Sequence, residues 1–196
     1  MALIDAVSAA FPQDRFLVPH LWVLENRADM ALYRGQADVA WEIVSTRWGA
    51  LSRSLFLRIH QYAAIFAVHL RARTAIAVAA ASPHKRAKHL AEAARCARKL
   101  DRQDVPWATV LAVCIRAGAA SVEDRRDVAL SLLNEAEGLA RGASMAFYVA
   151  AAQHRRGILS GGTVGAQLVA AAQSWASSQG VVHPSRVFDT FVPGQF

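Results

Sequence analysis

The 196-residue sequence predicts an all-α protein in which antiparallel helical hairpins stack as an irregular repeat array of about eight helices. Hydrophobic residues make up 54% of the chain, and alanine, the strongest helix former, dominates them. Apolar side chains recur at steps of three and four along most of the sequence, as on the buried face of a helix. β-Branched and aromatic runs with a period of two, which would indicate strands, are missing from the sequence.

The first part of the chain predicts a short helix followed by one hairpin. Residues 3–11 form the short helix, and Asp14 stands where the N-cap of a helix over 15–34 should be. A second helix covers 37–48, and a glycine follows each helix of the pair. Two amphipathic helices joined by so short a turn pack as an antiparallel hairpin.

The stretch 51–81 contains no proline or glycine and predicts one long central helix. Apolar residues lie on most of its circumference, which places the helix in the middle of the domain, between the 37–48 helix and the helix that follows. Four arginines interrupt the apolar pattern and indicate that the helix is not buried all round and does not span a membrane. These are Arg53, Arg58, Arg71 and Arg73.

The second half of the chain predicts five more helices. Ser82 followed by Pro83 is a strong start signal for a helix over 83–100. Ser121 with Asp124 matches a capping box, and Thr163 can cap the last helix. The four helices after residue 100 are expected at 104–118, 122–140, 143–159 and 163–179.

The predicted hairpins define a single helical-repeat domain over residues 1–180. Hairpin starts recur at roughly 37 to 53 residues, within the range of helical repeats, and no hairpin can bury its apolar face alone. The expectation is an irregular tetratricopeptide-like solenoid or a compact right-handed bundle. Glycine and proline recur after residue 180, so 181–196 is predicted to be an irregular C-terminal tail.

Net charge, the N-terminal sequence and the cysteines bear on the partner and on the cellular compartment. The formal net charge of +7 permits an acidic protein, nucleic acid or acidic lipid as partner without selecting among them. The N-terminus carries Asp5 and no basic region, unlike a signal peptide, and we predict a cytoplasmic protein without membrane attachment. Cys96 and Cys114 are expected to be small core residues in a reducing compartment.

The sequence contains no pattern that predicts catalysis, a cofactor or a metal. The seven histidines form no metal-binding pattern. The span 157–163 resembles a phosphate-binding loop in its glycines and Thr163, but the required lysine is missing and no strand precedes it. The chain is therefore predicted not to be an enzyme. An unrecognised active site would need a polar pocket with a perturbed histidine or carboxylate. The five tryptophans are expected in the core, with a partner-binding groove as the alternative.

One surface feature points to a function. Between Pro83 and Gln103 the chain carries seven basic residues against two acidic ones, which accounts for most of the net charge. This basic face is either a solvated helix surface or a docking surface for an acidic protein, a phosphate or a nucleic-acid backbone. No aromatic residue lies within it, which argues against binding of single strands. The candidate partner-binding residues are Lys88, Arg95, Arg98, Lys99 and Arg102.

Several stretches from about residue 30 to the C-terminus share the pattern of a known family. They are Leu32-Tyr33-Arg34-Gly35 with Ala40-Trp41, Leu70-Arg71-Ala72-Arg73, and the final Gly180, Pro184, Arg186 and Pro193-Gly194. The chain thereby resembles the tetratricopeptide-like C-terminal region of large bacterial serine/threonine protein kinases, abundant in myxobacteria. The resemblance implies a parent protein with an N-terminal kinase domain and often an ATPase-like middle region.

The sequence itself contains none of the kinase machinery. It has no glycine-rich loop after a strand, no HRD segment with its downstream Asn, and no DFG, so the family's catalytic residues map to no position here. We therefore expect a fragment, the product of a split gene, or a protein that has lost its kinase part. The predicted function is a non-catalytic scaffold that binds a protein or peptide and serves a kinase system. The alternative is a basic, helical nucleic-acid-binding protein, which we rank second.

Overall fold

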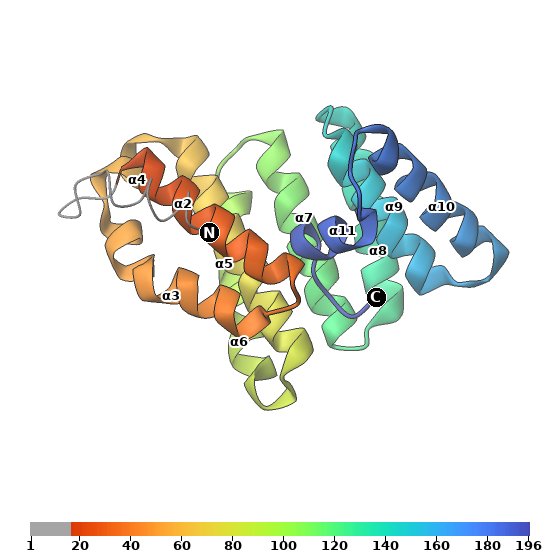
Figure 1. Ribbon diagram of the computed structural model, residues 1–196, viewed down its shortest axis with the longest axis horizontal. Coiled ribbons are helices and arrows are strands. Elements are labelled where there is room, and N and C mark those ends of the chain that lie inside the picture. The colour runs from red at the N-terminus through yellow and green to blue at the C-terminus, as the bar shows by residue number, and fades with distance from the viewer. Residues whose placement is uncertain (1–16) are drawn as a thin grey trace.

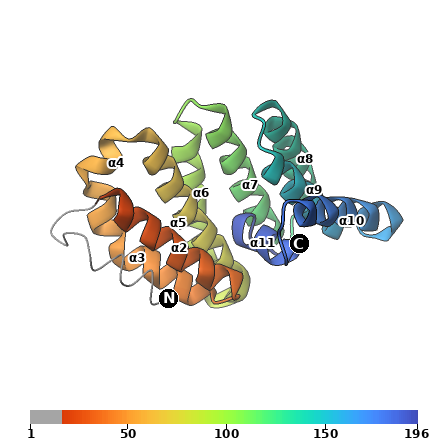
Figure 2. The same ribbon diagram turned by 45° about the horizontal axis from the view of Figure 1, so that its top comes forward.

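The computed structural model describes residues 17–196, and this part of the chain folds as a row of antiparallel helical pairs (Figures 1 and 2). Within that range there are ten α-helices, nine of them with at least seven residues, and no strand. The predicted all-α array of stacked hairpins is confirmed. The predicted helix over 3–11 and the Asp14 cap lie outside the described residues.

The four pairs follow one another along the chain. They are α2 (Val18–Tyr33) with α3 (Ala37–Arg53), α5 (Gln61–Ala81) with α6 (Arg86–Asp101), α7 (Pro106–Val122) with α8 (Arg126–Gly142), and α9 (Ala146–Ser160) with α10 (Gly162–Ser178). Three shorter elements complete the described chain: α4 (Leu55–Ile59), the 3-10 turn η1 (Pro83–Lys85) and α11 (Pro184–Phe191).

The central helix is shorter than the sequence predicted. Helix α3 runs through Gly49 to Arg53, and the chain leaves helical geometry at Ser54 and again at His60. The Ser54 hydroxyl accepts a hydrogen bond from the Leu57 amide at 3.3 Å, so it caps α4 in the way serine commonly begins a helix. One uninterrupted helix over 51–81 was therefore wrong, because an N-cap serine lies within that stretch.

Helix α5 nevertheless occupies the central position that the sequence predicted. It contacts α2, α3, α6 and α7, and Ile65, Leu70 and Ile76 are among its fully buried side chains. By length and composition α5 could cross a bilayer, but 67% of that apolar window is buried within the fold, as is common for a core helix. The helix lies in the centre of the domain because its apolar circumference requires partners on several sides.

The turns between the later helices differ from the predicted caps. Ser121 lies inside α7 instead of capping the next helix, and α8 begins at Arg126 after Asp124, which has a positive φ of 58°. Gly161, with φ of 65°, takes the N-cap position of α10 that Thr163 was expected to fill. In both turns a residue in the left-handed region reverses the chain, and glycine and aspartate tolerate that region best.

The residues after α10 are not the irregular tail that the sequence predicted. Instead of an irregular tail over 181–196, the chain forms α11 and packs back against the array. In Figures 1 and 2, α11 lies beside α7, between α2 on one side and α9 on the other. Its Phe188 is fully buried, as is Val192 just after the helix, and both join the core cluster of α7 to α10. The segment therefore belongs to the folded domain.

Candidate functional site

The C-terminal segment, residues 184–196, lies on the first helix of each pair. We call α2, α5, α7 and α9 the inner helices, because their side chains and backbone contact this segment. Their partners α3, α6 and α8 form the opposite, outer layer. The C-terminal segment therefore packs across one helix of all four pairs, and we call the surface of the inner helices that it covers the groove.

Arg73 of α5 is the first of two buried arginines that hold the segment. Its side chain is only 1% exposed, and its Nη1 donates a hydrogen bond to the Thr190 carbonyl at 2.9 Å. The same nitrogen lies 2.8 Å from a carboxylate oxygen of Asp29 on α2. The guanidinium also lies 4.6 Å from the ring centroid of Phe191, within the range of cation–π contacts. One side chain therefore links α2, α5 and the segment.

Arg155 of α9 repeats this arrangement two residues further along the segment. Its side chain is 3% exposed, its Nε donates to the Val192 carbonyl at 3.0 Å, and its Nη2 lies 2.6 Å from Asp189. The Phe196 ring is 5.2 Å away. Burial lowers the pKa of the Arg155 guanidinium, while the Asp189 carboxylate acts in the opposite direction. A buried cation of this kind needs a carboxylate and hydrogen-bond acceptors, and the segment supplies both.

The side chains of α11 enter an aromatic pocket on α9. The fully buried Phe188 ring lies 5.7 Å from the Phe147 ring and 4.9 Å from the His154 ring. His154 Nε2 is 3.2 Å from the Ser185 hydroxyl, which also accepts a hydrogen bond from Gln173 of α10. Burial and the neighbouring Arg155 lower the pKa of His154 to about 4, so the imidazole is neutral at pH 7.

The end of the segment crosses α7 at a glycine. A Cβ on Gly118 would lie closer than 3.0 Å to the Pro193 carbonyl oxygen, so only glycine permits this approach of the two backbones. One turn later, the Ser121 hydroxyl donates to the Gly118 carbonyl at 2.8 Å and accepts from the Gln195 amide at 3.1 Å. The Gln195 side chain reaches the Ala80 carbonyl at the end of α5.

Three titratable side chains near Arg73, those of Glu25, His69 and Tyr148, have shifted pKa values. Burial, and secondarily Asp29, raises the pKa of Glu25, whereas burial and then Arg73 lower the pKa of His69. Burial raises the pKa of Tyr148, whose ring lies 6.2 Å from that of His69. An unrecognised active site would need perturbed groups of this kind. The cavities beside Gly35, Trp175 and His183 are lined by other residues.

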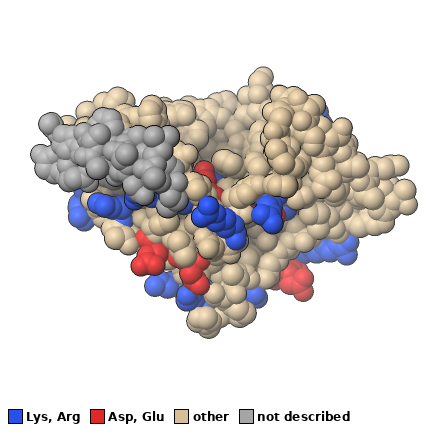
Figure 3. Space-filling model, viewed as in Figure 1, with Lys and Arg blue, Asp and Glu red and all other residues tan. Residues whose placement is uncertain are grey.

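The predicted basic face lies on α6, in the outer layer. The five candidates Lys88, Arg95, Arg98, Lys99 and Arg102 are all exposed. Arg95 forms an ion pair with Glu92, and the neighbouring Lys85 pairs with Asp38 of α3. On the face that carries α11, charged side chains gather near the centre and the lower edge, and the upper part is largely uncharged (Figure 3). The five basic residues therefore face solvent, while other residues of α6 pack against the inner helices α5 and α7.

The tryptophans have several surroundings. Trp41 and Trp48 enclose the Arg71 guanidinium, at 4.8 and 4.5 Å from their ring centroids, and Arg71 also pairs with Glu92. Trp107 packs 5.6 Å from the Phe66 ring, and Trp175 lines a cavity of about 640 Å³ between the α8–α9 turn and α10. Trp22 is 58% exposed.

The sequence did not predict the two arginines that hold the segment, Arg73 and Arg155, or the enclosed position of Arg71. Arg71 and Arg73 suggested an exposed side of the central helix, and no sequence pattern singled out Arg155. In the structure Arg73 and Arg155 are buried and Arg71 is 13% exposed. For Arg71 and Arg73 the available signal was their place in a strongly apolar helical run, because an arginine is buried there only where partners from other elements neutralise it.

The cysteines and possible metal ligands add no chemistry to the site. Cys96 and Cys114 are buried free thiols, and burial raises their pKa values to about 11 and about 12. Thiols with such high pKa values are poor nucleophiles at neutral pH. Among residues 17–196, no group of three or more His, Cys, Asp or Glu side chains is arranged to hold a metal ion.

Comparison of the chain with protein-family models, with curated proteins and with solved structures finds no match.

Proposed function

We propose that this chain is a non-catalytic helical scaffold that binds a peptide segment of a protein partner. The observation that supports this function is the occupied inner face. Four successive helical pairs present side chains and backbone atoms to one short segment, and two buried arginines donate to its carbonyl groups. Helical-repeat proteins use extended inner surfaces of this type to hold peptides and helices.

The resemblance to kinase C-terminal regions gives the scaffold its proposed setting. Such a scaffold would be the regulatory or partner-binding part of a bacterial serine/threonine kinase system. Its contribution would be recognition alone, since the sequence carries no kinase motif. The perturbed groups Glu25, His69 and Tyr148 belong to the interior around Arg73, whose charge is paired with Asp29.

The basic face of α6 adds electrostatic complementarity for an acidic partner. Exposed charges at the edge of an interface mainly increase the association rate and favour partners of opposite charge. Replacing Arg95, Arg98 and Lys99 with glutamate should therefore weaken partner binding by about tenfold at low salt, with a smaller effect at high salt.

A matched control separates this local effect from net charge. Replacing Arg47, Arg53 and Arg58 with glutamate makes the same change in formal charge on α3 and α4, again at exposed positions. The tagged chain is crosslinked in its own cells, the recovered partner is identified by mass spectrometry, and it is titrated against all three purified proteins. Equal affinities for the wild type and the α6 variant would remove the basic face from the binding site.

The alternative function, nucleic-acid binding, depends on the same exposed residues of α6. It predicts retention on heparin and binding to random DNA that weakens steeply with salt. It also predicts that the α6 variant, but not the α3–α4 control, loses this binding. Absence of any shift of duplex or single-stranded DNA at low salt would eliminate the alternative.

A further inference from the structure

The C-terminal segment has the properties of a docked peptide ligand. Helix α11 has only eight residues, and isolated helices of that length are unstable in water. Its last carbonyl groups have no partner within the helix, and Arg73 supplies one at Thr190. Arg155 does the same for the Val192 carbonyl at the C-cap. Formation of the helix and docking on the inner helices are therefore a single event.

The groove is largely assembled without the segment. Arg73 is positioned by Asp29 of α2, and Ser121 by the Gly118 carbonyl of its own helix. The aromatic pocket is formed by Phe147 and His154 on one helix, α9. Arg155 is the exception, because the carboxylate that pairs with it, Asp189, belongs to the segment. A vacant groove would thus present one unpaired guanidinium to an incoming ligand.

The contacts define which peptide the groove accepts. The arginines bind backbone carbonyls, which any sequence provides, whereas the aromatic pocket requires a large ring at the position of Phe188. The Arg155 guanidinium favours a carboxylate at the next position, Asp189. The Gly118 crossing favours a turn that brings the backbone close to α7, as Pro193 does. The ligand class is a short helix with an aromatic–acidic pair, followed by an aliphatic residue and proline.

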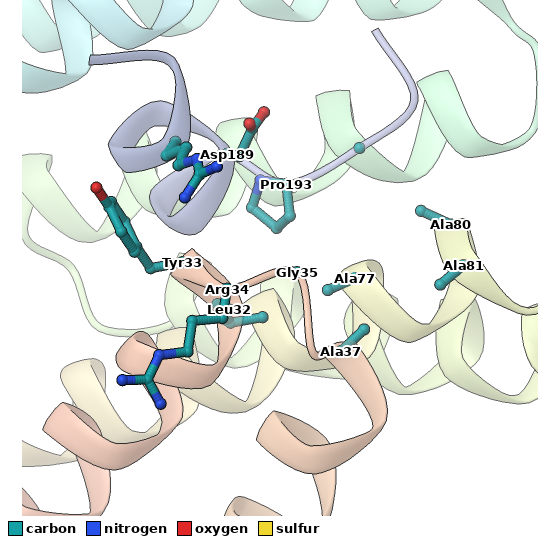
Figure 4. Close-up of a pocket in the computed structure, with 12 residues that line it drawn as sticks. Leu32, Tyr33, Arg34, Gly35, Ala37, Ala77, Ala80, Ala81, Asp189 and Pro193 are labelled. Carbon is teal, nitrogen blue, oxygen red and sulfur yellow. The ribbon is translucent and has the colours of Figure 1, made fainter. Parts of the chain in front are cut away.

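The segment leaves one end of the groove unfilled. A cavity of about 530 Å³ lies beside Pro193 and Gly194, with Leu32, Gly35, Ala77 and Ala80 among its walls (Figure 4). In Figure 4 the Arg34 side chain points away from it, so the small residues of α5 and the α2–α3 turn face the opening. A ligand that places more atoms beside Pro193 would gain contacts that the chain's own segment lacks. The position of Gly194 cannot provide them, because a Cβ there would lie 2.5 Å from Ser121 Oγ.

We propose, building on the proposed scaffold function, that the inner helices form a binding site for a partner protein's segment of this class. Residues 184–196 occupy the site in cis and compete with that partner. The five residues between α10 and α11 keep the segment at a high effective concentration, so an external peptide binds weakly until the cis segment is loosened. The partner's advantage is the additional volume beside Pro193.

The test uses the full chain and a labelled synthetic peptide of residues 182–196. In one variant Phe188→Ala and Phe191→Ala remove the rings of the cis segment, and in a second Asp189→Arg places a cation beside Arg155. Neither changes the groove. Fluorescence anisotropy should show that both variants bind the peptide at least about tenfold more tightly than the wild type, because the tethered competitor is weakened. Adding Arg155→Met to either variant should abolish the gain, as should a peptide carrying Phe188→Ala.

Several results would overturn the proposal. In one, either variant keeps its helical circular dichroism and its cooperative unfolding and still fails to bind the peptide. That result would show that the groove is not a ligand site. Loss of folding in both variants would make the segment an obligatory part of the core. Exchange of segments between two copies, seen as a dimer by light scattering, would replace the partner with a second copy. None of these results depends on the basic face of α6, so the scaffold function would fail separately, in the partner titration.

Discussion

Replacing Gly118 with alanine tests whether the C-terminal segment sits on α7. Gly118 lies inside α7, so alanine alone would favour the helix by about 1 kcal/mol. The added Cβ, however, would approach the Pro193 carbonyl oxygen to less than 3.0 Å and Ile76 Cγ2 to 3.3 Å. Overpacking of this kind costs about 1–3 kcal/mol, and release of the segment would remove a further hydrogen bond worth about 1 kcal/mol. We expect a net destabilisation of about 2 kcal/mol.

Gly138 provides the matched control. It lies exposed in α8, and a Cβ added there would meet no heavy atom within 4 Å, so Gly138→Ala should stabilise the protein by about 1 kcal/mol. Urea unfolding followed by far-ultraviolet circular dichroism measures both variants against the wild type. If Gly118→Ala proves as stabilising as Gly138→Ala, the segment does not cross α7 and the arrangement of the groove is wrong.

Three further outcomes are expected. The pKa of His154 is about 4 in the folded protein against an ordinary value of 6.5. As pH falls, the unfolded state therefore binds the proton first, and up to about 3 kcal/mol of stability is lost between pH 6.5 and pH 4. His154→Gln should flatten this part of the stability profile in urea titrations at successive pH values. Arg71→Met removes two cation–π contacts and the Glu92 pair and should lower stability by about 2 kcal/mol in the same assay. Gly157→Ala would place a Cβ 2.6 Å from the Gly165 carbonyl oxygen and should separate α9 from α10, lowering the melting temperature, whereas Gly138→Ala raises it.

The helical architecture was predictable because it depends on local and repeated signals. Apolar periodicity predicted nearly every helix of the array, and Gly35 correctly marked the end of the first, whereas Gly49 lies inside α3. The errors occurred where one side chain decides between two local structures. Ser54 caps a helix within the stretch 51–81, and Ser121 stays inside a helix because its hydroxyl bonds to the Gly118 carbonyl and the Gln195 amide. The bond between Ser121 and Gln195 joins residues that are 74 positions apart in the sequence.

The groove could not be predicted because its parts are distant in sequence. Arg73 meets Thr190 across 117 positions, and no local pattern marks that pairing. The proline and glycine after residue 180 correctly indicated breaks in the chain, but they said nothing of the eight helical residues between them. Those residues are helical because the groove binds their side chains and caps their carbonyls. Helix propensity alone would leave them unfolded.

Hydrogen exchange at individual amides of the C-terminal segment measures whether the segment is docked on the inner helices. The Val192 amide donates to the Phe188 carbonyl at 2.8 Å, and the Gln195 amide donates to Ser121 Oγ at 3.1 Å. Docking on the inner helices predicts that both amides are protected in the wild type and lose protection in the Asp189→Arg variant, while amides within α5 remain protected. Exchange of both amides in the wild type at the rate of an unstructured peptide would contradict the account.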